Sequence, residues 1–69
     1  MIANYKVTGM TCEHCVAHVT EEVSALKGVD DVKVTLADGA LQVTSASPID
    51  FGAVKEAVSE AGDYEVQPA

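Results

Sequence analysis

The chain has 69 residues, which is room for one small domain. Eleven Asp and Glu residues outnumber four lysines, there is no arginine, and the formal net charge is −7. This balance argues against nucleic acid as a partner, because neutralising phosphates requires clustered Lys and Arg. No apolar run approaches the roughly 20 residues that span a bilayer, and the N-terminus lacks the apolar core of a signal peptide. We therefore expect a cytoplasmic protein that is not embedded in a membrane.

The first segment, residues 2–8, alternates apolar and polar side chains and predicts a β-strand. Further on, the apolar period changes to that of a helix, which we expect from about Glu13 to Lys27. Lys27 in the last turn and Gly28 after it are typical of a helix C-terminus. The apolar stripe of this predicted helix consists of Val16, Val19, Val23 and Leu26.

Two alternating runs follow, and Asp38-Gly39 lies between them. Asp-Gly between alternating runs is a strong hairpin signal, because both residues tolerate positive φ. We therefore expect two antiparallel strands joined by a tight turn. The residues predicted to share the apolar face are Val32, Val34 and Leu36 in the first run and Leu41 and Val43 in the second.

A second helix is predicted after Asp50, which can serve as its N-cap, and Gly62 ends it. The tail, residues 64–66, alternates once more and predicts a short last strand that Pro68 stops. The apolar stripe of the second helix consists of Phe51, Val54, Ala57, Val58 and Ala61.

The predicted element order is βαββαβ, and residues 1–69 form a single domain without a linker. Each helix has one apolar stripe and each strand one apolar face. An α+β ferredoxin-like sandwich satisfies all of them, with a four-stranded antiparallel sheet and both helices on one face. The other face of the sheet is then open to water, and it is predicted to carry Lys6, Lys33, Thr35, Gln42 and Thr44.

The only two cysteines, Cys12 and Cys15, lie where the first strand gives way to the first helix. A disulfide closing so short a loop would stabilise the fold little, so these thiols indicate chemistry. The helix N-terminus favours the thiolate, and a pair of thiolates can be a soft-metal ligand set or a redox dithiol. Two thiolates do not complete a tetrahedral zinc site. Because soft sulfur at low coordination number selects Cu(I), we expect Cu(I) held openly at the surface.

Residues 9–15, Gly-Met-Thr-Cys-Glu-His-Cys, resemble the G-M-x-C-x-x-C loop of the heavy-metal-associated domain family. That family comprises small soluble copper chaperones and the N-terminal domains of copper-exporting P-type ATPases. The resemblance implies that Cys12 and Cys15 bind Cu(I). It also implies transfer of the ion, by ligand exchange, to the metal-binding domain of a copper-transporting P-type ATPase. Relatives selective for zinc or cadmium often place an acid before the first cysteine, where this chain has Thr11.

The family also implies a tyrosine near the metal, in a Gly-Tyr pattern before the last strand. Here Asp63 intervenes between Gly62 and Tyr64. Tyr64 is expected either to pack in the core or to donate a hydrogen bond near the thiolates. Met10 is expected to plug the core beneath the loop, although a thioether can also bind Cu(I).

His14 lies between the two thiols and is expected to point to solvent and tune the site electrostatically. Its imidazole can also bind copper, and this is expected in a copper-bridged homodimer more than in a single chain. Two other functions stay open: a thiol–disulfide redox protein, and a domain that buffers or senses copper without passing it on. The chain lacks the thioredoxin-type βαβ context of redox C-x-x-C motifs. No bond of an organic substrate is broken in the expected function, so the protein is not expected to be an enzyme.

Overall fold

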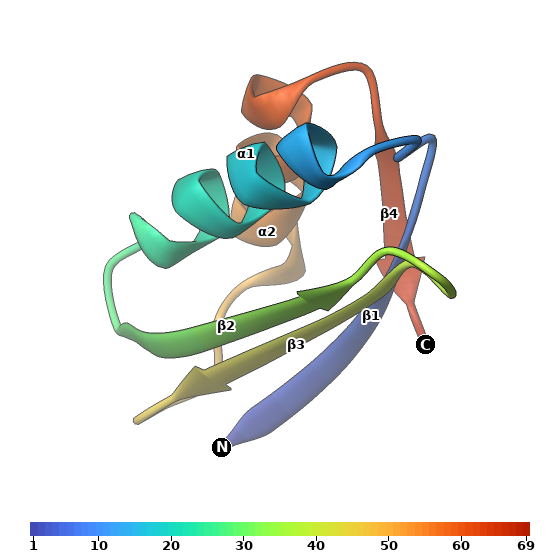
Figure 1. Ribbon diagram of the computed structural model, residues 1–69. Coiled ribbons are helices and arrows are strands. Elements are labelled where there is room, and N and C mark those ends of the chain that lie inside the picture. The colour runs from blue at the N-terminus through green and yellow to red at the C-terminus, as the bar shows by residue number, and fades with distance from the viewer.

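A computed structural model describes the whole chain, residues 1–69. The elements follow the predicted βαββαβ order (Figure 1). Their bounds are β1 Ile2–Thr8, α1 Glu13–Ser24, β2 Val29–Thr35, β3 Ala40–Ser45, α2 Phe51–Ala61 and β4 Glu65–Pro68.

The four strands form one antiparallel sheet in the order β2-β3-β1-β4. In the central pair, Tyr5 of β1 lies opposite Leu41 of β3, and on the other side of β1 Val7 lies opposite Val66 of β4. Both helices cover the same face of this sheet (Figure 1). The arrangement confirms the predicted ferredoxin-like fold. No helix is long and apolar enough to cross a membrane.

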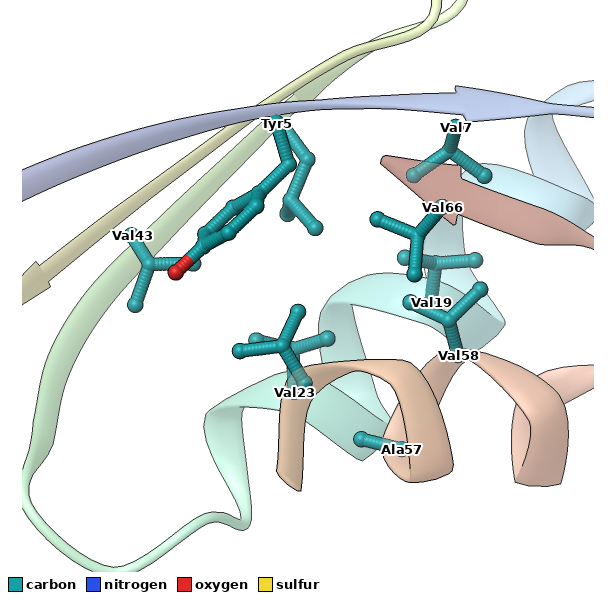
Figure 2. Packing of buried hydrophobic residues seen from close by; sticks show 10 residues of the cluster. Tyr5, Val7, Val19, Val23, Val43, Ala57, Val58 and Val66 are labelled. Atoms are coloured by element: carbon teal, nitrogen blue, oxygen red, sulfur yellow. The ribbon is translucent and has the colours of Figure 1, made fainter. Parts of the chain in front are cut away.

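The core lies between the helices and the covered face of the sheet (Figure 2). Apolar side chains from α1 and α2 meet those of the three strands β1, β3 and β4, as the predicted stripes require. The ring of Tyr5 stacks on that of Phe51 with centroids 5.9 Å apart. Only 12 of 69 residues are buried, so each large buried side chain carries much of the stability. The fully buried ones are Val19, Val23, Leu41, Val43, Val54 and Val58.

The first helix is shorter than predicted, because α1 ends at Ser24 instead of Lys27. The N–H of Ala25 bonds the carbonyl of Glu21 and the N–H of Leu26 bonds the carbonyl of Val23, and the chain then turns through Gly28 at φ +90°. Leu26 nevertheless packs against the core from this turn, so the apolar spacing continues where the helix does not. The spacing of apolar residues alone does not distinguish a last helical turn from a tight turn that places the same side chain against the core.

The second strand starts earlier than predicted. β2 begins at Val29, and the register shifts between Val29 and Asp31. Such a bulge interrupts the alternation of apolar and polar side chains. The alternation therefore does not reveal the first residues of the strand. The prediction that Leu36 shares the covered face was wrong: it follows the strand and is 37% exposed.

The Asp38-Gly39 hairpin is confirmed, with positive φ (+71°) at Gly39 alone. Asp38 contributes differently, because its carboxylate accepts a hydrogen bond from the N–H of Ala40 at 3.1 Å. The carbonyl of Gly39 accepts a hydrogen bond from the N–H of Val7 at 2.8 Å, which fastens the turn to β1.

The last strand begins and ends later than predicted. Tyr64 precedes β4, and Pro68 belongs to the strand, opposite Tyr5. Proline is tolerated there because β4 is an edge strand, where one side of the backbone has no partner. The prediction that Pro68 stops the strand was therefore wrong.

Candidate metal site

Two loops that are distant in the sequence meet at one end of the molecule. Thr8, the last residue of β1, pairs with Glu65, the first residue of β4. Because the two strands are antiparallel, the loop after β1 and the loop before β4 leave the sheet at the same end of the paired strands (Figure 1). The first loop leads to Cys12, and the second carries Tyr64.

The sulfur atoms of the two cysteines lie next to each other at this end of the molecule. Cys12 precedes α1 in extended conformation (φ −155°, ψ 169°), and Cys15 lies in the first turn of the helix. The carbonyl of Cys12 accepts the N–H of Cys15 at 3.1 Å, which brings the two residues onto one side of the turn. Their Sγ atoms are 3.2 Å apart, and both thiols are free. Cys12 is exposed and Cys15 is half-buried.

Cys15 ionises readily, because its pKa is lowered from the usual 9.0 to about 6. The largest cause is a hydrogen bond from the Tyr64 hydroxyl, and the backbone of Thr11 and the side chain of Cys12 add to it. Donors that point at sulfur stabilise the thiolate over the thiol. In turn, the bond to Cys15 raises the pKa of Tyr64. Cys15 is therefore mostly thiolate at neutral pH.

The sequence favoured the helix N-terminus as the origin of an acidic thiol, but the leading donor comes from the other end of the chain. Tyr64 reaches the site in spite of Asp63, because its N–H turns back to the carbonyl of Gly62 at 2.9 Å. Its half-buried side chain also packs against the core. Tyr64 therefore lies both against the core and beside Cys15. The backbone contribution of Thr11, whose side chain is exposed, was not expected from the sequence.

Met10 and His14 are the remaining candidates near the pair. Met10 is half-buried and packs against the core, as expected of a plug. His14 is exposed in the first turn of α1. No three or more His, Cys, Asp or Glu side chains are grouped closely enough to hold a metal ion. One copy of the chain therefore offers a metal ion the two sulfurs and no further ligand of these types.

The fold and this thiol pair define a small domain of the kind that carries heavy metals. The family described as heavy-metal-associated domain matches residues 4–63. This match covers most of the chain and includes both cysteines. The protein therefore belongs to the heavy-metal-associated domain family.

Named relatives include small proteins of similar length and segments of larger proteins. The copper chaperone CopZ of Staphylococcus epidermidis is 38% identical over 63 residues, which cover 90% of this chain and 91% of that protein. Copper-transporting ATPase 1 of Rhizobium meliloti is 36% identical over 69 residues, which are all of this chain and 8% of the ATPase. Among solved structures, a CopZ metallochaperone superposes with a TM-score of 0.87 at 28% identity, covering 97% of this chain and all of that one.

Proposed function

We propose that this protein is a copper(I) carrier that binds the ion between Cys12 and Cys15 and passes it to another thiol-bearing domain. The observation that carries the proposal is the pair of free sulfurs, 3.2 Å apart at one end of the molecule. The acidity of Cys15 supports it, because metals bind the thiolate and not the thiol. The relatives named copper chaperone, which match the chain over most of its length, also support it.

The number and softness of the ligands favour Cu(I) over zinc. Thiolate sulfur is a soft donor, and Cu(I) is stable with few such ligands, whereas structural zinc is bound by four. No third His, Cys, Asp or Glu is grouped with the pair to complete a tetrahedral site. A site with two ligands leaves room for the sulfur of an acceptor to approach the ion.

Transfer follows from the different exposure of the two cysteines. Cys12 is exposed in an extended segment before the helix, whereas Cys15 is half-buried and hydrogen-bonded. An incoming thiolate forms a bond to the ion, the bond to Cys12 breaks, and a second exchange then replaces Cys15. The ion passes through three-coordinate states, stays Cu(I) throughout, and is not released as a free ion. No bond of an organic substrate is made or broken, so the function is not enzymatic.

The acceptor that we propose is the metal-binding domain of a copper-transporting P-type ATPase. The chain aligns over its full length with a segment that makes up 8% of one such ATPase. A domain of the same design presents thiols in matching geometry, which makes exchange near thermoneutral and reversible. The proposal requires both thiols to be reduced, which is the state that the cytoplasm maintains.

The structure also bears on the redox alternative. Two sulfurs 3.2 Å apart, one of them acidic, could form a disulfide with a bond of about 2.05 Å. In a thiol–disulfide exchange protein, however, the acidic thiol must be accessible in order to attack a substrate disulfide. Here Cys15, whose pKa is lowered, is half-buried. Its limited accessibility favours metal transfer over disulfide exchange.

A competition experiment tests the proposal. The reduced protein is titrated with Cu(I) against a chelator of known affinity, and in parallel with Zn(II). We expect one Cu(I) for each chain and a clear preference for Cu(I). Failure to take up Cu(I), or a preference for Zn(II), would contradict the proposal.

Transfer needs a second experiment. Copper-loaded protein is mixed with an isolated metal-binding domain of a copper-transporting ATPase, the two are separated, and copper is measured in each. A redistribution complete within the time of mixing is expected. The same acceptor with its cysteines replaced by serine is the control. A chain that keeps its copper indicates a buffer or sensor, and disulfide reductase activity without copper uptake indicates the redox function.

A further inference from the structure

Gly62 lies directly against the ring of Tyr64. A Cβ placed on Gly62 would be 2.7 Å from Cε2, 3.0 Å from Cζ and 3.2 Å from the hydroxyl oxygen of Tyr64. Carbon atoms that are not bonded do not approach to 2.7 Å, since optimal contact is about 3.5–4.0 Å. Any side chain larger than hydrogen at residue 62 would therefore displace the ring, beginning with the atoms next to the hydroxyl.

The backbone of Gly62 does not require glycine. Its φ of 162° and ψ of −167° belong to extended chain, which residues with a side chain also adopt. This separates Gly62 from Gly9, Gly28 and Gly39, whose positive φ values favour glycine on conformational grounds. At Gly62 the need is for space, and the group that occupies the space is the ring of Tyr64.

A second glycine borders the same ring. A Cβ on Gly9 would lie 3.4 Å from Cδ1 of Tyr64, which is ordinary contact distance. The ring is thus bordered by Gly9 of the loop after β1 and Gly62 of the loop before β4. The hydrogen bond from the N–H of Tyr64 to the carbonyl of Gly62, at 2.9 Å, folds the chain around Asp63 so that the ring returns over Gly62.

We propose that Gly62 is a positioning residue: the absence of its side chain lets the Tyr64 ring fold back over residue 62 and bring the hydroxyl to the sulfur of Cys15. The turn at Asp63 and the space at Gly62 act together, because the extra residue would otherwise carry Tyr64 past the thiol pair. The importance of this arrangement for metal transfer rests on the function proposed above. The positioning itself is a property of the metal-free protein and is tested there.

The first test is NMR of the reduced, metal-free chain and its Gly62→Ala variant. We expect nuclear Overhauser effects between the α protons of Gly9 and the ring of Tyr64 in the unchanged protein, and their loss in Gly62→Ala. Replacing Cys15 by serine should shift the Tyr64 ring resonances when Gly62 is present and leave them unchanged in the Gly62→Ala background. The response of the Tyr64 ring resonances to Cys15→Ser reports the link between the ring and the thiol. A ring that only packed in the core would not give this response.

Gly52→Ala is the matched control. It makes the same chemical change at an exposed position of α2, where the added carbon would meet only the carboxylate of Asp50, which can move aside. We expect Gly52→Ala to keep both the contact between Gly9 and Tyr64 and the response to Cys15→Ser. If Gly62→Ala keeps them as well, the proposal is wrong.

A cycle of urea unfolding experiments covers the case in which Gly62→Ala disrupts folding. The urea concentration at the midpoint of unfolding is measured with and without Gly62→Ala. This is done first with Tyr64 present and then in a Tyr64→Ala background, which lacks the ring. We expect Gly62→Ala to lower the midpoint only where the ring is present. An equal loss in both backgrounds would overturn the proposal, because the cost would then arise from the backbone. Since no metal is present, these results do not depend on whether the protein binds Cu(I).

Discussion

The hydroxyl of Tyr64, in the loop before β4, is the main group that lowers the pKa of the Cys15 thiol, in the first turn of α1. This relationship depends on the pairing of β1 with β4, which places the loop that leads into α1 beside the loop that carries Tyr64 (Figure 1). The pKa of the half-buried Cys15 is about 6, and Cys12 is exposed beside it.

Tyr64→Phe is expected to raise the pKa of Cys15 from about 6 toward the usual 9.0, because the largest hydrogen bond that stabilises the thiolate is lost. The measurement is the pH dependence of alkylation of Cys15 in a Cys12→Ser background, where it is the only thiol. Tyr5→Phe, which removes a hydroxyl from the buried ring that stacks on Phe51, is the control and should leave the midpoint unchanged. An unchanged midpoint in Tyr64→Phe would show that the hydroxyl does not act on Cys15.

The same pKa makes the stability of the metal-free protein depend on pH. The folded pKa of Cys15 is lowered, so its contribution to the free energy of unfolding is fully present above the unfolded value of 9.0. The contribution falls as pH decreases and is lost below the folded value of about 6. Between these limits we expect stability to rise with pH more steeply in the unchanged chain than in Cys15→Ser. Urea unfolding at several pH values under reducing conditions measures the difference, and parallel curves would contradict it.

Cys12→Ser and Cys15→Ser are each expected to weaken Cu(I) binding by more than about 100-fold. Loss of a group that only supports a ligand already costs roughly 10–100-fold, and here a proposed ligand itself is removed. His14→Ala is the control, because His14 is exposed and is not grouped with the cysteines. Competition against a Cu(I) chelator measures the Cu(I) affinity of all three variants. Full affinity in Cys12→Ser would exclude a site made of two thiolates.

Leu41→Ala is expected to lower the free energy of unfolding by about 2–5 kcal/mol, because it leaves a cavity in a small core. Leu41 is fully buried, and few other side chains could fill the space. Leu36→Ala is the matched control: it makes the same change in the same hairpin, but Leu36 is 37% exposed. We expect a change within about 0.5 kcal/mol there. Urea unfolding measures the free energy of unfolding of both variants. Similar losses would contradict the different burial of Leu41 and Leu36.

Most of the fold could be predicted from the sequence, because each helix and strand carries its own apolar pattern. The stripe that includes Val19 and Val23 predicted α1, and Asp38-Gly39 predicted the hairpin. The errors lie where local geometry changes without a change in hydropathy. Leu26 keeps the apolar spacing beyond the end of α1, and the bulge at Asp31 hides the start of β2.

By itself, the sequence determined the order of the elements, the sandwich that they form and the place of Cys12 and Cys15 between a strand and a helix. These features depend on residues that are near one another in the chain. Only the tertiary structure decided that Tyr64, in spite of Asp63, lies where it lowers the pKa of Cys15. Contact between Tyr64 and Cys15 requires β1 and β4 to pair in one register, with Thr8 opposite Glu65, and requires the chain to fold back at Gly62. Neither condition is encoded in a local pattern, because both depend on how distant segments pack.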